Sequence, residues 1–198
     1  MDGKLGVYFP QKTVYNEYTS YASESEREFW EEPTLIRSNA REIAVHLAFA
    51  LGFSNESADE LLKESLTREN FQQLSEEDPL YQEFPNEKQR QYIQALVKGV
   101  YEHGAELDGY ISKYAIGWSF SRISRMAAAV MRVAMYEILY MPDIPPAAAI
   151  NEAVELSKHY ETQETASFIN GILGAFVRGE LPPERAAAPA QAQTEDEQ

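Results

Sequence analysis

The stretch between Ser124 and Tyr160 constrains the fold more than any other, because its first half is apolar on nearly every side. Between Met126 and Met141 only Arg132 and Glu137 carry charge. A helix that is apolar around its whole circumference belongs in the middle of a helical bundle, not on its surface. The stretch therefore predicts a buried central helix.

A proline-rich turn follows this helix and reverses the chain. Pro142 stops the first helix, while Pro145 and Pro146 suit the first turn of a second one, where missing amide donors cost nothing. The second helix places small or apolar residues on one face: Ala147, Ile150, Val154 and Ser157. The sequence thus predicts an antiparallel pair of helices.

Helical periodicity also dominates the rest of the chain, and no alternating strand pattern competes with it. We expect helices over about 34–51, after Ser54, and over 86–103, 105–114, 146–160 and 164–177. Thr34 and Asn86 are the expected N-caps, and Trp118 and Phe120 are expected to plug the end of the bundle. The polar stretch 67–85 holds two prolines and predicts mainly a loop. The fold class is all-α.

Both ends of the chain differ in composition from the part between them. Residues 1–33 alternate tyrosines with polar residues and end in an acidic run, which predicts a mobile extension. Residues 181–198 are rich in alanine, proline and glutamine and predict a disordered tail. The expected organisation is therefore one helical domain over 34–180 between two tails.

Composition excludes several classes of function. The chain has no cysteine, which removes disulfides, thiolate metal sites and thiol nucleophiles. His46, His103 and His159 fall on separate helices without metal-ligand spacing, so we predict no metal, no cofactor and no catalytic group. No signal peptide and no apolar stretch of about 18 residues is present, which predicts a cytoplasmic protein without a membrane span.

The charge balance is strongly acidic, with a formal net charge of −15. Residues 37–180 hold 21 acidic and 13 basic side chains and therefore carry −8. Such a field repels nucleic acid at long range. A basic protein partner fits it better.

Four sequence blocks carry a family resemblance. They are AVMRVAMYEI in the central helix, DIP at 143–145, AINEAVELSK at 149–158 and FINGIL at 168–173. In this order and spacing they resemble the NusB family of transcription antitermination factors, over residues of about 36–180. The resemblance implies a NusB-like helical bundle, in which two packed sub-bundles share the long central helix.

Arg37 and Arg41 are candidate RNA-binding residues. They are four residues apart on one helix, so they share a face and can hold two neighbouring phosphates. Alone, such a pair is usually just a solvated face. The resemblance implies contact with boxA RNA at this point, although Ser38 and Asn39 stand where the family usually has further arginines.

Phe168 is the third candidate, because it matches a family phenylalanine implicated in RNA binding. An exposed phenylalanine can stack on a base. Its spacing to Ile172 and Phe176 is equally typical of a core position.

The resemblance also implies a protein partner, ribosomal protein S10 (NusE), which in the family binds boxA together with NusB better than either does alone. The S10-facing surface of the family includes the start of the central helix and the turn before AINEA. Ala127, Pro146 and Ala147 stand there in this chain, where charged or aromatic residues are common. We therefore expect a shifted or more hydrophobic interface, with these candidate anchors: Met126, Tyr136, Tyr140 and Met141.

A buried charge network is expected around the central helix. A lone guanidinium in an apolar helix requires a carboxylate partner. We therefore predict that Arg132, Glu137 and Glu152 form a structural network.

These features predict a non-enzymatic antitermination factor that docks S10 and holds boxA of nascent ribosomal transcripts next to RNA polymerase. One alternative is an interaction scaffold or a homodimer with weak or no RNA binding. Another is the RNA-targeting domain of an rRNA methyltransferase, which is disfavoured because no Rossmann-type segment follows Phe176.

Overall fold

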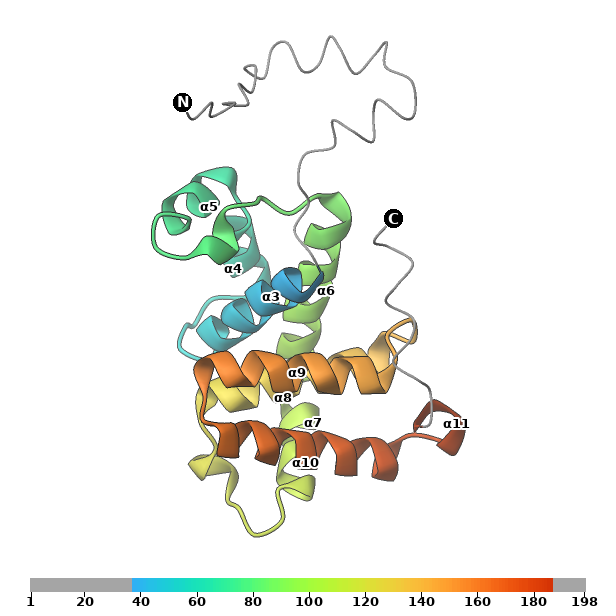
Figure 1. Ribbon diagram of the computed structural model, residues 1–198. Helices are drawn as coiled ribbons and strands as arrows, with labels where there is room; N and C mark the ends of the chain where they lie inside the picture. The colour runs from blue at the N-terminus through green and yellow to red at the C-terminus, as the bar shows by residue number, and fades with distance from the viewer. Residues whose placement is uncertain (1–36, 187–198) are drawn as a thin grey trace, which may run out of the picture. The chain divides into compact units, whose positions relative to one another are not determined.

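The computed structural model describes residues 37–186, and every regular element in this range is helical. The α-helices are α3 (Arg37–Leu51), α4 (Ala58–Ser65), α5 (Arg68–Leu74), α6 (Glu87–Glu102), α7 (Gly104–Tyr114), α8 (Arg125–Tyr140), α9 (Pro146–Tyr160), α10 (Gln163–Glu180) and α11 (Pro183–Ala186). Two 3-10 helices, η1 (Pro79–Tyr81) and η2 (Phe120–Arg122), lie in the connections. The prediction of an all-α fold is confirmed (Figure 1).

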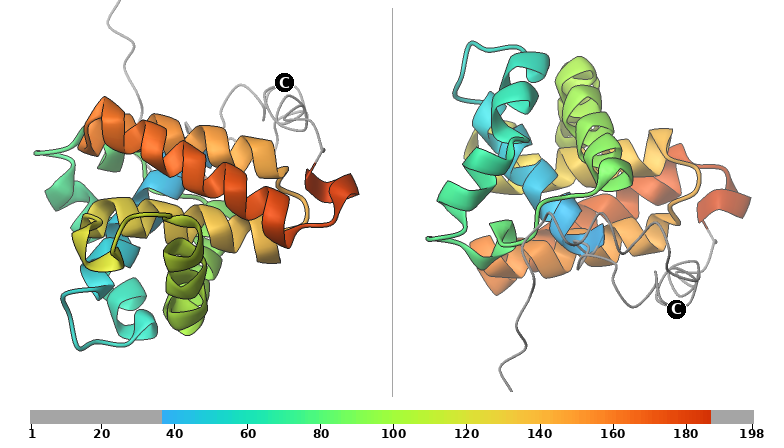
Figure 2. Two further views of the ribbon diagram at one scale, coloured as in Figure 1. Left: turned by 90° about the horizontal axis from the view of Figure 1, so that it is seen from below. Right: turned by 90° about the horizontal axis from the view of Figure 1, so that it is seen from above.

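Helix α8 is the centre of the fold. Ser124 caps its start by accepting a hydrogen bond from the amide of Ala127 at 3.0 Å, and most of its side chains are buried. Helices α3 and α6 pack on one part of α8, with α4 against both of them, and α7, α9 and α10 pack on another part (Figure 2). The expected pair of sub-bundles sharing a central helix is therefore present.

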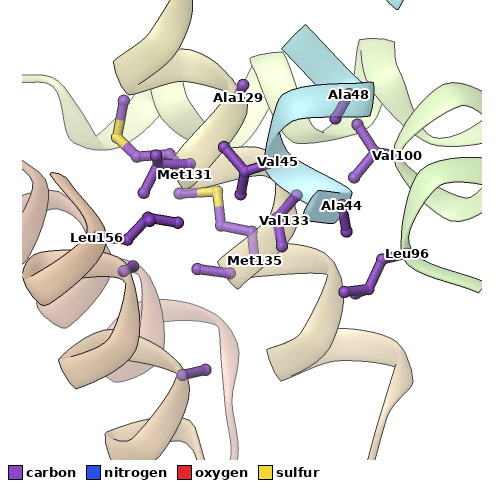
Figure 3. Packing of buried hydrophobic residues seen from close by; sticks show 14 of the residues in the cluster. Ala44, Val45, Ala48, Leu96, Val100, Ala129, Met131, Val133, Met135 and Leu156 are labelled. Atoms are coloured by element: carbon purple, nitrogen blue, oxygen red, sulfur yellow. The ribbon is translucent and has the colours of Figure 1, made fainter. Parts of the chain in front are cut away.

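The core lies where α8 meets the helices of both sub-bundles. Val45 of α3 and Leu156 of α9 lie beside the methionines Met131 and Met135, and Leu96 of α6 lies on the side of Ala44 (Figure 3). Met131 and Met135 are fully buried. Burial around most of its circumference explains why α8 lacks a polar face.

Helices α6 and α8 approach closely at Gly99. A Cβ atom at this position would lie 1.9 Å from Cζ of Tyr136, so the tyrosine ring lies directly over the glycine. Only glycine allows this approach.

The prediction that 67–85 is mainly a loop is wrong. The side chain of Thr67 caps α5 by accepting from the amide of Asn70 at 3.2 Å. Phe71 is buried and packs edge-on against Tyr81 and Phe84, with ring centroids 5.3 and 5.1 Å apart. Helix α5 has only seven residues and one buried side chain, so its sequence has no repeating apolar pattern from which a helix could be predicted.

The expected tails lie mostly outside the described residues, as does the expected N-cap Thr34. The short helix α11 falls within the stretch predicted to be disordered. Nη2 of Arg185 donates to the carbonyl of Ile138 at 2.7 Å, which ties α11 to the end of α8. Disorder is thus the wrong prediction for 183–186. Within residues 37–186, the helices are too short or too polar to cross a membrane.

Candidate nucleic-acid interface

Arg41 lies inside the protein and not on its surface. The residue as a whole is 2% exposed. Nε and Nη2 donate to the carboxylate of Glu137 at 3.0–3.1 Å, and Nη1 donates to Glu152 at 2.7 Å. The hydroxyl of Tyr92 donates to the same carboxylate of Glu137.

This environment keeps Arg41 charged. Burial disfavours the charged guanidinium, but the charges of Glu137 and Glu152 and the hydrogen bond to Glu137 together favour it, so the pKa of Arg41 is raised. Burial together with the charge of Glu137 also raises the pKa of Tyr92. Because every face of the guanidinium is occupied by protein, the prediction that Arg41 contacts phosphate is wrong.

The expected network also has a different arginine at its centre. Arg132 binds Asp108 of α7, with Nε–Oδ1 and Nη2–Oδ2 distances of 2.7 and 2.9 Å. Arg132 and Glu137 are five residues apart on α8 and point to different sides of it, and their ion-pair partners lie on α7 and α3. Glu137 and Glu152 do form a structural network, but their cation is Arg41.

Arg37, one turn before Arg41, is exposed. Its guanidinium carbon lies 5.8 Å from the ring centroid of Tyr92, in a cation–π contact. Within residues 37–186 no carboxylate forms an ion pair with it. Of the two arginines, Arg37 is therefore the one that a phosphate can reach.

Phe168 lies at the edge of the core. It is half-buried, whereas Ile172 and Phe176 are buried. Its ring packs against Trp118 with centroids 5.2 Å apart. Trp118 is 47% exposed, so it covers Phe168 and does not plug the bundle as predicted. Phe168 keeps an accessible edge, beside the loop between α7 and α8.

The structure does not bring Arg37 and Phe168 together. Helix α3 packs on α4, α6 and α8, while α10 packs on α7, α8, α9 and α11 (Figure 1). An RNA that contacts both residues must therefore run across the surface between two sub-bundles.

Two of the predicted partner-binding residues offer little or no surface. Ala127 is 0% exposed and Pro146 is buried. Both side chains are buried, Ala127 near the start of α8 and Pro146 at the start of α9. The prediction for Ala127 and Pro146 is therefore wrong, while Met126 and Ala147 remain half-buried.

The tyrosines near the end of α8 form an aromatic cluster. Tyr136 and Tyr140 have ring centroids 4.9 Å apart, and His103 lies 4.3 Å from Tyr140. The hydroxyl of Tyr140 donates to Glu106 at 2.8 Å. Burial, followed by this hydrogen bond, raises the pKa of Tyr140 to about 12. Met126 lies at the opposite end of α8, about 20 Å away at 1.5 Å per residue, so it does not join this cluster.

A second polar cluster, which the sequence did not reveal, surrounds His46 of α3. Its Nδ1 lies 2.9 Å from the hydroxyl of Tyr81, and its Nε2 lies 2.7 Å from that of Tyr160. The Tyr160 hydroxyl donates to Glu42 at 2.5 Å, so it accepts from Nε2. Burial lowers the pKa of His46. This neutral imidazole links α3, η1 and α9 and has a structural role.

The described residues hold no metal-binding cluster. Between positions 37 and 186, no three His, Asp or Glu side chains are placed to hold an ion. The candidate residues described above are exposed cations and aromatic rings, side chains that can bind nucleic acid or protein.

Comparison with known proteins identifies relatives over most of the chain. The NusB family model matches residues 38–178. The transcription antitermination protein NusB of Acetivibrio thermocellus is 41% identical over 145 residues, which is 73% of this chain and 90% of that protein. NusB of Carboxydothermus hydrogenoformans is 41% identical over 138 residues, or 70% of this chain and 90% of that protein.

Solved structures show the same fold. NusB of T. maritima matches with a TM-score of 0.64 and 27% identity, over 77% of this chain and 98% of that one. NusB in complex with NusE and double-stranded RNA matches with a TM-score of 0.55 and 24% identity, over 71% and 94% of the two chains. At that identity the second likeness shows the fold alone.

Proposed function

The chain belongs to the NusB family of transcription antitermination proteins, and from this premise we propose that it pairs with ribosomal protein S10 (NusE) and binds boxA RNA. The RNA is the boxA segment of nascent ribosomal transcripts, held next to RNA polymerase in the cytoplasm. The role is non-catalytic, because positioning the RNA requires no bond to be made or broken.

The burial of Arg41 is the observation that most strongly supports the need for a basic partner. Inside the protein, Glu137 and Glu152 neutralise the positive charge of Arg41 by forming ion pairs with it. This leaves Arg37 as the exposed member of the pair, on a body of residues 37–180 that carries −8. An acidic body that keeps only one exposed arginine of this pair binds a polyanion weakly. Basic charge from S10 supplies what the chain lacks.

The proposed RNA contacts are made by two residues. Arg37 is free of carboxylates in the described range and can bind a phosphate. Phe168 has an accessible ring edge beside Trp118 and can contact a base. For S10 we propose the surface-exposed parts of these side chains: Met126, Tyr136, Tyr140 and Ala147.

Co-purification of three components tests the proposal. Tagged S10 is immobilised, and the chain is added with boxA RNA or with an RNA of the same composition in scrambled order. We expect S10 to retain the chain, and the pair to retain boxA in preference to the scrambled RNA. Failure of S10 to retain the chain would refute the proposal.

A scaffold or homodimer without RNA activity is the second candidate. The observation in its favour is that only one arginine of the expected pair is accessible. Titration of boxA against Arg37→Ala in the presence of S10 separates the two candidates. Unchanged affinity favours the scaffold.

A further inference from the structure

The longest acid-free part of the sequence surrounds the loop between α7 and α8. Residues 109–136 contain four Lys or Arg and no Asp or Glu, in a chain that holds 32 acidic residues among 198. Residues 37–180 carry −8, of which this segment contributes +4. This segment is therefore basic within an otherwise acidic sequence, and its unpaired cations favour an anionic ligand.

Two of these four cations are not used in ion pairs. Lys113 pairs with Glu180 and Arg132 pairs with Asp108. Arg122 and Arg125 are exposed, and no carboxylate within residues 37–186 forms an ion pair with either of them.

Both free arginines lie against exposed aromatic rings. The guanidinium carbon of Arg122 is 5.2 Å from the ring centroid of Trp118, and that of Arg125 is 4.2 Å from Phe53. Trp118 and Phe53 are 47% and 60% exposed. Exposed rings beside unpaired cations are typical of surfaces that bind single-stranded nucleic acid.

The loop holds these side chains in an ordered backbone, coloured yellow-green in Figure 1. The amide of Trp118 donates to the carbonyl of Ala115 at 3.0 Å, and the amide of Arg122 donates to that of Ser119 at 2.9 Å. Gly117 makes the turn with a φ of 81°. The hydroxyl of Ser124 donates to the carboxylate of Glu161. A preformed surface loses less entropy on binding.

We propose that Trp118, Arg122 and Arg125 form an RNA-contacting surface beyond Arg37 and Phe168. An unpaired base stacks on the exposed part of the Trp118 ring, and the two arginines hold the flanking phosphates. This inference rests on the proposed RNA-binding function, and it assigns an RNA path along the α7–α8 loop. Complementary charge is the reason to choose a polyanion over a protein partner.

Binding of labelled boxA RNA in the presence of S10 tests the arginines. We expect Arg122→Ala/Arg125→Ala to weaken binding about tenfold. The matched control is Lys63→Ala/Arg68→Ala, which removes the same charge from exposed positions on α4 and α5. The control should change affinity by less than about twofold, because it leaves the loop intact. Equal losses in both variants would overturn the inference.

The tryptophan is tested in the same assay. Trp118→Ala should bind about tenfold more weakly, whereas Trp118→Phe retains an aromatic face and most of the affinity. Tyr101→Ala, which removes an exposed ring from α6, serves as the control. Thermal unfolding of each variant checks that it is folded. Wild-type affinity in Trp118→Ala would overturn the inference.

Fluorescence gives a direct readout of stacking. The chain has two tryptophans, so a Trp30→Phe background leaves Trp118 alone. Subtracting the signal of Trp30→Phe/Trp118→Phe removes any contribution of S10. We expect boxA to quench Trp118 over the same concentration range in which it binds. Binding without quenching refutes the role of Trp118 and leaves the proposed function intact. If the wild-type chain together with S10 does not bind boxA, both are refuted.

Discussion

Arg41 of α3 and Glu137 of α8 form an ion pair inside the protein, with neither side chain more than 3% exposed. The pair joins two helices that are 96 residues apart in sequence. Arg41 is therefore part of the core and is absent from the predicted RNA surface. The same contact explains how a charged residue remains within the otherwise apolar α8.

Removing Glu137 should destabilise the protein strongly. Glu137→Ala leaves Arg41 buried without its main counter-charge, which typically costs about 3–5 kcal/mol of unfolding free energy. Glu137→Gln keeps a hydrogen-bond acceptor and should lose less. Chemical denaturation measures both, with Glu155→Ala on the exposed side of α9 as control. A loss in Glu137→Ala no larger than that of the control would contradict the structural role of the pair.

Glu152 makes a weaker contribution, because its carboxylate is 30% exposed. Glu152→Ala removes one charged hydrogen bond to Arg41, and we expect a loss of about 1 kcal/mol. RNA affinity in the presence of S10 should stay at the wild-type value. An unaltered melting temperature, or a loss of RNA binding in a fully folded variant, would refute this assignment.

Stability should depend on pH through His46. Burial lowers its pKa from 6.5 in the folded protein. The unfolded state therefore binds more protons, and stability falls as pH drops from about 6.5 toward the lower folded pKa. Urea denaturation at pH 7.5, 6.5 and 5.5 should show a steeper loss for the wild type than for His46→Gln. Parallel curves would show that His46 is not the group responsible.

Arg37 should contribute one phosphate contact. Arg37→Ala should weaken boxA binding in the presence of S10 and lower the slope of log affinity against log salt by about 0.7. The control is Arg68→Ala, since Arg68 also lies over an aromatic ring, that of Phe84 at 4.7 Å, but on a different helix. An unchanged salt slope would remove Arg37 from the RNA surface.

The helices with strong periodicity or clear caps could be predicted from the sequence. The capping box at Asn86 and Gln89 is formed, with hydrogen bonds of 2.8 and 2.9 Å. Helix α5 could not be predicted, because the aromatic side chains that pack around Phe71 and stabilise it are separated from it in the sequence.

The candidate site could be predicted only in part, because burial depends on tertiary packing. Arg37 and Arg41 look equivalent in sequence, yet one is exposed and the other enters the core. Arg132 was the obvious buried cation, but its partner is Asp108. No local pattern distinguishes these arginines, since their carboxylates lie on other helices.

The affinity of boxA RNA for the chain, measured with and without S10, shows whether RNA binding requires a basic partner. At one salt concentration, fluorescence anisotropy gives the dissociation constant for the chain, for S10 and for the pair. We expect the pair to bind at least about tenfold more tightly than the chain alone, because S10 supplies the missing positive charge. Tight binding by the chain alone, unchanged by S10, would contradict the account.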